Sequence, residues 1–270
     1  MSKIGQAVHE IHVMDQLAAR DQWVNKVHPL VKLVLTISYL VTLVSFSKYD
    51  VMGVTGMIVY PMALFLLTEL SFSDSLRRLR VVLPLVCLIG LFNPVFDRQI
   101  LMIGDLPVRA GFLSMFTLIW KGVLSVLASY LLIATTSMEK ICYAMRMIRI
   151  PRIIVTQIML MYRYLTVLLE EADRMTQAYQ LRAPGQKGIH FRVWGSLVGQ
   201  LLLKSMDRAG NVYESMLIRG YDGEYGYMGE QIRIAWTDIC YFLFWMILFL
   251  IFRRWPVMLL AGKAVGGILR

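Results

Sequence analysis

The chain has 270 residues, of which 57% are hydrophobic, with a mean hydropathy of +0.59 and a formal net charge of +10. This composition is more apolar than that of an ordinary soluble domain, so it argues against one and predicts an integral membrane protein. A helix that crosses a bilayer needs about 20 mostly apolar residues, because lipid offers no partner for an unpaired backbone amide or carbonyl.

Residues 1–30 are polar and charged, without the apolar core of a signal peptide. We expect a cytoplasmic N-terminal segment with an interfacial helix. His9 and His12, followed by Asp15, also suggest a metal site. A polar terminal segment fits an interfacial helix better than a sheltered cation site, so metal binding is the minor alternative.

Five apolar stretches are long enough to be considered as spans. Four lie within residues 31–136 and form predicted transmembrane helices 1–4, and the last is followed by a C-terminal tail, 253–270. The five stretches are 31–46, 51–68, 81–96, 112–136 and 234–252.

Some of these stretches contain prolines or charged residues. The third stretch contains Pro84 and Pro94 and should be kinked or incomplete. Glu69, Lys121 and Asp238 lie near predicted span ends, where we expect their polar groups to reach the interface.

The distribution of cations predicts the orientation of the chain. Three arginines, Arg77, Arg78 and Arg80, crowd the turn between the second and third spans, and residues 137–233 hold the densest set of cations. Cytoplasmic loops of membrane proteins carry such an excess, so both regions are expected in the cytoplasm. Arg253 and Arg254 favour the cytoplasm as well, whereas an odd number of spans would place the tail outside.

Residues 137–233 are predicted to form a cytoplasmic coupling-helix domain. Apolar residues recur at helical spacing from Ile154 to Leu168, and a helix of some thirty residues should break at Ala183-Pro184-Gly185. A second long helix should run from near His190 to Gly220. The predicted fold class is therefore an all-α integral membrane protein, with about five transmembrane helices and long amphipathic cytoplasmic helices.

The two long helices end on a similar short sequence. Arg182 and Arg219 each follow a small residue by four positions and have small or apolar neighbours. An arginine in a last turn can simply complement the helix dipole, which stabilises the helix by about 0.3–1 kcal/mol. The paired occurrence favours a second interpretation, in which two similar tips dock into two equivalent grooves of partner subunits.

With these features the sequence resembles the transmembrane (T) components of energy-coupling factor (ECF) transporters, most closely the CbiQ type from cobalt uptake systems. The resemblance spans nearly the whole chain and rests on four features. These are Met14-Asp15, the Val27-His28-Pro29-Leu-Val-Lys32 start of the first span, Arg149-Ile-Pro151-Arg152 before the long helix, and the two arginine tips.

The resemblance implies that each X-Arg-X motif ends a coupling helix and contacts one of two ATP-binding cassette ATPase subunits. The matching positions are Leu181-Arg182-Ala183 and Ile218-Arg219-Gly220, although the family usually has Ala-Arg-Gly or Ala-Arg-Ser. It also implies a membrane substrate-binding (S) subunit, for cobalt a CbiM-type protein with a small accessory membrane subunit. The setting would be the inner cell membrane of a prokaryote, and the pathway cobalamin biosynthesis. Nickel or vitamin systems are the alternatives to cobalt.

No phosphate-binding loop of the type G-x-x-x-x-G-K-[ST] occurs, so ATP and Mg²⁺ are expected in partner subunits and the chain is expected to be non-catalytic. We expect it to bind no cofactor, no metal and no nucleic acid. A self-contained secondary transporter is the alternative of a different class, and it would need an intramembrane polar site and usually an inverted repeat. A membrane enzyme would need convergent catalytic side chains, and the four histidines are scattered.

Overall fold

A computed structural model describes residues 3–20, 22–68, 83–84, 86–94, 100–103, 106–185, 188–223 and 234–254. The chain divides into two compact units. Unit 1 comprises Met1–Ala18 and Ser137–Gln231, and unit 2 comprises Ala19–Thr136 and Ile232–Arg270.

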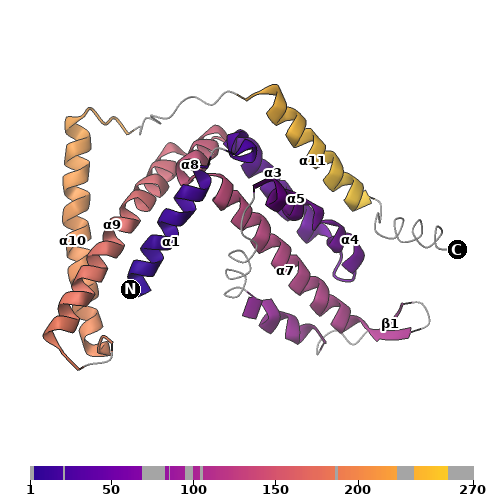
Figure 1. Ribbon diagram of the computed structural model, residues 1–270, viewed down its shortest axis with the longest axis horizontal. Coiled ribbons are helices and arrows are strands. Elements are labelled where there is room, and N and C mark those ends of the chain that lie inside the picture. Colours follow the sequence, from indigo (N-terminus) through magenta and orange to yellow (C-terminus); the bar gives the residue numbers. More distant parts are fainter. Residues whose placement is uncertain are drawn as a thin grey trace. The chain divides into compact units, whose positions relative to one another are not determined.

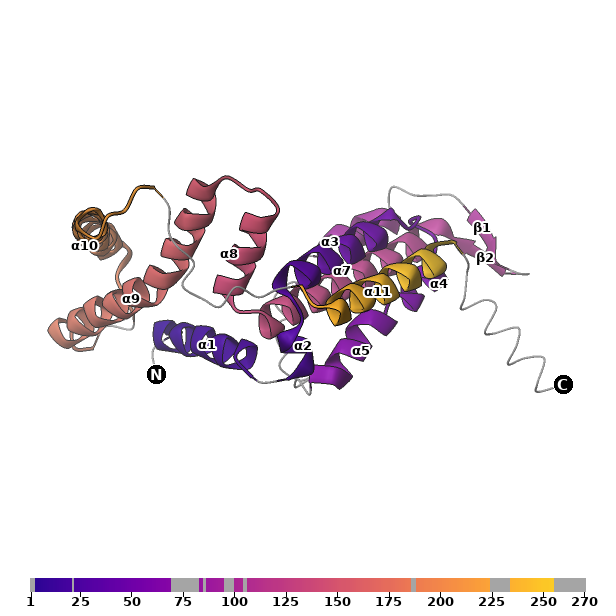
Figure 2. The same cartoon turned by 90° about the horizontal axis from the view of Figure 1, so that it is seen from above.

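Unit 2 is a bundle built on helix α7 (Ala110–Thr135). Helix α3 (Pro29–Ser45) packs between α7 and α11 (Trp236–Arg254), while α4 (Val51–Gly56) and α5 (Val59–Thr68) also contact α7 (Figures 1 and 2). The short helix α2 (Trp23–Lys26) contacts α5, and an antiparallel hairpin of β1 (Ile100–Ile103) and β2 (Leu106–Arg109) leads into α7.

Local chemistry explains where these helices begin and break. Pro29 occupies the first turn of α3, and the His28 ring accepts a hydrogen bond from the Leu30 amide at 3.2 Å. Pro61 has no amide hydrogen to donate to the carbonyl of Met57, four residues earlier, and the chain breaks there between α4 and α5. The Tyr39 hydroxyl donates to this carbonyl at 3.0 Å, which satisfies a buried backbone group.

The centre of unit 2 is aromatic. Tyr60 stands edge-on to Trp245 and Phe249, with ring centroids 4.9 and 5.3 Å apart, and Tyr39 lies against Phe249 at 5.4 Å. Such contacts add about 0.5–1.5 kcal/mol each beyond the burial of area. They join α3 and α5 to α11, which is far from both in the sequence.

Unit 1 is built on α9 (Arg152–Arg182). The other helices of the unit are α1 (Lys3–Ala18), α8 (Met138–Met147) and α10 (Phe191–Ile218), and each of them packs against α9. Tyr162 of α9 donates a hydrogen bond of 2.7 Å to the Asp15 carboxylate of α1, which fixes the N-terminal helix along α9. The two long helices and the break between them lie where the sequence predicted them.

The all-α membrane fold is confirmed, with the β1–β2 hairpin as an exception among the described residues. Four helical segments are long and apolar enough to cross a membrane, and α3 is a shorter apolar helix. The four are Val51–Thr68, Ala110–Thr135, Arg152–Arg182 and Trp236–Arg254. Three of these, with α3, match predicted spans.

Residues 81–96 and helix α9 do not simply match the predicted spans. The predicted span 81–96 lies partly outside the described residues, although 86–94 are helical and Asn93 donates to the Ser114 hydroxyl of α7 at 3.2 Å. The long helix α9, predicted to be cytoplasmic, also passes the test of length and composition for a span, and only 11% of its most apolar window is buried.

Asp238 lies near a span end, in the first turn of α11, as the sequence predicted, but both Asp238 and Lys121 bind groups within unit 2. Asp238 is 6% exposed and accepts a hydrogen bond from the His28 amide at 3.3 Å. Lys121 lies well inside α7 and donates to the carbonyls of Val44 and Phe46, at 3.2 and 2.6 Å, so it caps the end of α3. Glu69 and the Arg77–Arg80 cluster lie outside the described residues.

Candidate functional site

The Arg219 tip of α10 has a fixed backbone. Gly220 adopts φ +80°, its amide donates to the Leu217 carbonyl at 2.9 Å, and the Tyr221 amide donates to the Met216 carbonyl at 3.0 Å. This pair of bonds is a Schellman motif, which needs a left-handed residue after the C-cap and therefore favours glycine. Arg219 is the C-cap itself, so the motif holds its backbone in one place.

The Arg182 tip of α9 closes differently. Arg182 is the last helical residue, Ala183 follows with φ −125°, and the turn is completed by Gly185 at φ +95°. The two tips that look alike in sequence are thus different cap structures. Both expose their apolar neighbours, since Leu181 is 83% and Ile218 87% exposed.

Neither arginine is committed to a contact within the described part of the chain. No hydrogen bond or ion pair there occupies the guanidinium of Arg182 or of Arg219. A guanidinium carries five donors in a planar fork and can pair bidentately with a carboxylate. Both tips can therefore present that fork, together with an exposed apolar side chain, to another protein.

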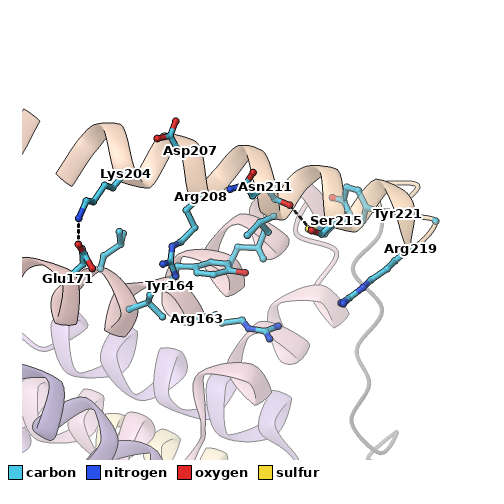
Figure 3. Close-up of a pocket in the computed structure, with 16 residues that line it drawn as sticks. Arg163, Tyr164, Glu171, Lys204, Asp207, Arg208, Asn211, Ser215, Arg219 and Tyr221 are labelled. Atoms are coloured by element: carbon cyan, nitrogen blue, oxygen red, sulfur yellow. Dashed lines mark hydrogen bonds and ion pairs between the residues drawn. The ribbon is translucent and has the colours of Figure 1, made fainter. Parts of the chain in front are cut away.

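A groove of about 900 Å³ runs between α9 and α10 (Figure 3). Its walls are apolar side chains interrupted by charged ones, and Arg219 lines it whereas Arg182 does not. Figure 3 shows Arg208 of α10 reaching down beside Tyr164 of α9, with Arg163 further along the same groove. The apolar members are Leu160, Val167, Leu168, Val212 and Met216.

One ion pair joins the two helices across this groove. Lys204 of α10 donates to the Glu171 carboxylate of α9, and this hydrogen bond lowers the pKa of Glu171 below its usual range. Arg174 lies close to the same carboxylate at 3.9 Å. The Glu171–Lys204 contact is partly exposed, so it contributes little to stability.

The outer surface of α10 is apolar along much of its length. No residue of α10 is buried, and its apolar side chains are mostly half exposed or more: Phe191 91%, Leu202 59%, Leu203 64% and Met206 63%. Contiguous apolar surface of this kind marks contacts with proteins or lipid. Gly195 and Gly199 lie on one face of the helix, and a Cβ added at either would meet nothing within 4 Å.

Sequence reasoning found the two tips but not the groove. Arg163 and Arg208 counted only toward the cationic excess of residues 137–233, and the Glu171–Lys204 pair was not predicted, because these side chains meet only through the packing of α10 on α9. The alternative metal site at His9 and His12 gains no support, since the described residues contain no group of three or more His, Cys, Asp or Glu side chains that could hold an ion.

Part of the chain is similar to known proteins. Two uncharacterized proteins of Methanocaldococcus jannaschii are similar: MJ1089, 29% identical over 147 residues, and MJ1571, 30% identical over 117 residues. The matches cover 53% and 42% of this chain and 54% and 39% of the relatives, so the chain spans about half or less of the length of these curated proteins.

A sequence profile of the cobalt transport protein family, CbiQ, matches residues 20–228. The match includes the predicted spans up to α7, the long helices α9 and α10, and both arginine tips. With four helical segments long and apolar enough to span a membrane, the chain is a multi-pass membrane protein. It belongs to the CbiQ cobalt transport protein family.

Proposed function

We propose that the chain is the T subunit of an ECF-type importer, with cobalt ions as the transported substrate. In this role it carries no reaction of its own. Two ATP-binding cassette ATPase subunits bind ATP and Mg²⁺, and their motion passes through α9 and α10 to a membrane S subunit, for cobalt a CbiM-type protein with its small accessory subunit. Nickel or a vitamin is the alternative cargo.

The observation that carries this proposal is the pair of exposed arginine tips on two long helices of one unit. Each tip combines an uncommitted guanidinium with an apolar residue that is more than four-fifths exposed, among the residues that the structure describes. A chain that worked alone would gain nothing from two such tips, whereas a pair of ATPase subunits offers two equivalent acceptors. Membership of a transport family supports the same reading.

The exposed apolar length of α10 supports a second contact, with the S subunit. An isolated helix draws most of its stability from packing of an apolar face, and α10 buries no residue in this chain. Gly195 and Gly199, four residues apart on one face, allow the backbone of another helix to approach closely. We assign this face to the S subunit and the arginine tips to the ATPases.

The proposal is tested by tagging the chain in its native host and purifying it in mild detergent. ATPase subunits and a second membrane protein should co-purify, and ATP hydrolysis by the complex should drive uptake of Co²⁺ into vesicles. Arg182→Ala and Arg219→Ala should each lower the bound ATPase or the uptake at least about tenfold, because breaking a desolvated charge pair costs on the order of 2–5 kcal/mol.

Two other exposed arginines serve as controls, Arg174→Ala on α9 and Arg192→Ala on α10, and both should act like wild type. Wild-type uptake by the Arg182→Ala, Arg219→Ala double variant would contradict the proposed role of the tips. Uptake by the purified chain alone would instead establish a secondary transporter.

A further inference from the structure

The chain passes between its two units three times, and near each passage in the sequence, on the unit 2 side, lies a residue that is hydrogen-bonded to one short segment of unit 2. The passages fall at residues 18/19, 136/137 and 231/232. On the unit 2 side of each one, a residue within seven positions of the boundary is hydrogen-bonded to a residue between 25 and 32. We call residues 25–32 the anchor segment.

The first and third passages are held by ordinary polar contacts. The Asn25 amide group donates to the Arg20 carbonyl at 2.9 Å, just after the first passage. The His28 backbone amide donates to one oxygen of Asp238 at 3.3 Å, and the Ala235 amide donates to the other oxygen at 2.9 Å. Asp238 therefore joins the first turn of α11 to the start of α3.

The second passage is held by a lysine that is almost completely buried. Lys32 is 5% exposed, and its ammonium donates to the carbonyl of Thr135, the last residue of α7, at 2.9 Å. A positive charge at this end complements the helix dipole and satisfies a free carbonyl. Burying an ammonium is nevertheless costly, and ionisable groups kept inside membrane helices are mostly functional.

We propose that the anchor segment is where unit 2 receives the motion of α9 and α10, with Lys32 and Asp238 as positioning residues. The inference rests on the proposed function, because it assigns a path to the force that the ATPases deliver. The three covalent connections offer a path along which a movement of unit 1 can reach unit 2, and on the unit 2 side of each one a residue is hydrogen-bonded to the anchor segment. Pro29, in the first turn of α3, stiffens that segment.

The chain contains its own matched control. Lys121 is a second lysine that caps a helix within unit 2, with its ammonium on the Val44 and Phe46 carbonyls at the end of α3, but none of these residues lies near a passage. Lys32→Met and Lys121→Met remove the same chemistry, one at the anchor segment and one away from it. Their melting temperatures report the purely structural loss.

The test compares Co²⁺ uptake per ATP hydrolysed in reconstituted complexes. Lys32→Met should keep the ATPase subunits bound and ATP hydrolysis running, while uptake per ATP falls by at least about tenfold, a usual size for coupling between linked sites. Lys121→Met should keep the wild-type ratio. Equal ratios in the two variants would overturn the inference.

A double-variant cycle provides the second measurement. Lys32→Met and Asp238→Asn should combine non-additively in uptake per ATP, because both loosen one anchor, whereas Lys121→Met and Asp238→Asn should combine additively. Additivity in both cycles would contradict a shared anchor.

Hydrogen exchange on the purified full-length chain separates failure of this inference from failure of the proposed function, because it requires no ATPase. Lys32→Met should speed exchange both in the last turn of α7 and in the first turn of α11. Lys121→Met should speed it only near the end of α3. Faster exchange confined to α7 in Lys32→Met would overturn the anchor even if the ATPases assemble as proposed.

Discussion

Arg149 and Gly220 occupy equivalent positions, each directly after the C-cap residue of its helix, α8 and α10. The Arg149 amide donates to the Arg146 carbonyl at 3.1 Å and the Ile150 amide to the Met145 carbonyl at 3.3 Å, so α8 closes in the same Schellman motif as α10. Arg149 adopts φ +67° where α10 has glycine at φ +80°. A side chain in this left-handed conformation costs roughly 1–2 kcal/mol. The strain is kept directly before α9.

We expect Arg149→Gly to make the chain more stable than Arg149→Ala, by about 1 kcal/mol, because both variants lose the guanidinium and only alanine keeps the left-handed strain. For a chain of this size the difference amounts to about 2 °C in melting temperature. Thermal unfolding of the two purified variants in one detergent measures it. An alanine variant as stable as the glycine variant would show that the turn relaxes on substitution.

At the level of the element, α10 is a long helix with no residue buried against the described part of the chain. Glycine inside a helix costs about 1 kcal/mol relative to alanine, yet α10 carries Gly195 and Gly199 on one face with open space around each. Nothing in the described part of the chain requires these two glycines to be small. A helix of another subunit that packed closely against this face would require small residues at both positions. That is the contact proposed for the S subunit.

Gly199→Leu should therefore leave the chain folded but weaken co-purification of the S subunit about tenfold, because overpacking a close helix contact costs on the order of 1–3 kcal/mol. Gly199→Ala should raise the melting temperature slightly. Ser196→Leu, at an exposed small residue one position beyond Gly195, is the control and should keep the S subunit bound. Equal loss in the two leucine variants would remove the assignment of this face.

At the scale of the whole molecule, the proposed mechanism requires α10 to lie on the cytoplasmic side of the membrane, where the ATPase subunits are. The loop between α3 and α4 carries Lys48 and Asp50, whereas α9 and α10 carry several arginines, among them Arg163, Arg182 and Arg208. The positive-inside rule therefore predicts that α9 and α10 lie on the cytoplasmic side and the α3–α4 loop on the other side of the membrane. The apolar length of α9 makes a direct measurement necessary, since a helix of this composition is also compatible with a span.

Cysteine labelling of intact cells gives that measurement. In a background without Cys87, Cys142 and Cys240, Ser47→Cys should react with a membrane-impermeant thiol reagent. Gln200→Cys, which is exposed on α10, should react only after the cells are opened. Labelling of Gln200→Cys from outside would place α10 away from cytoplasmic ATPases and contradict the proposed function.

Local patterns in the sequence determined much of this protein. Apolar stretches of about the length of a bilayer crossing predicted α4–α5, α7 and α11, and a shorter one predicted α3. Proline and glycine predicted the break after Arg182, and the recurring arginine predicted both exposed tips. These features are local, because helix length, helix ends and hydrophobic period depend on residues within a few positions of one another.

The tertiary structure alone decided which distant groups meet. Asp238 and His28 are 210 positions apart, and Lys32 and Thr135 are 103 apart. No periodicity links such pairs, so Asp238 was assigned to the interface and Lys32 only to a motif. Likewise, packing of α10 on α9 brings Arg219 to the groove and leaves Arg182 outside it. These polar groups are buried, and a buried polar group inside a membrane protein needs a hydrogen-bond partner. The tertiary structure supplies that partner.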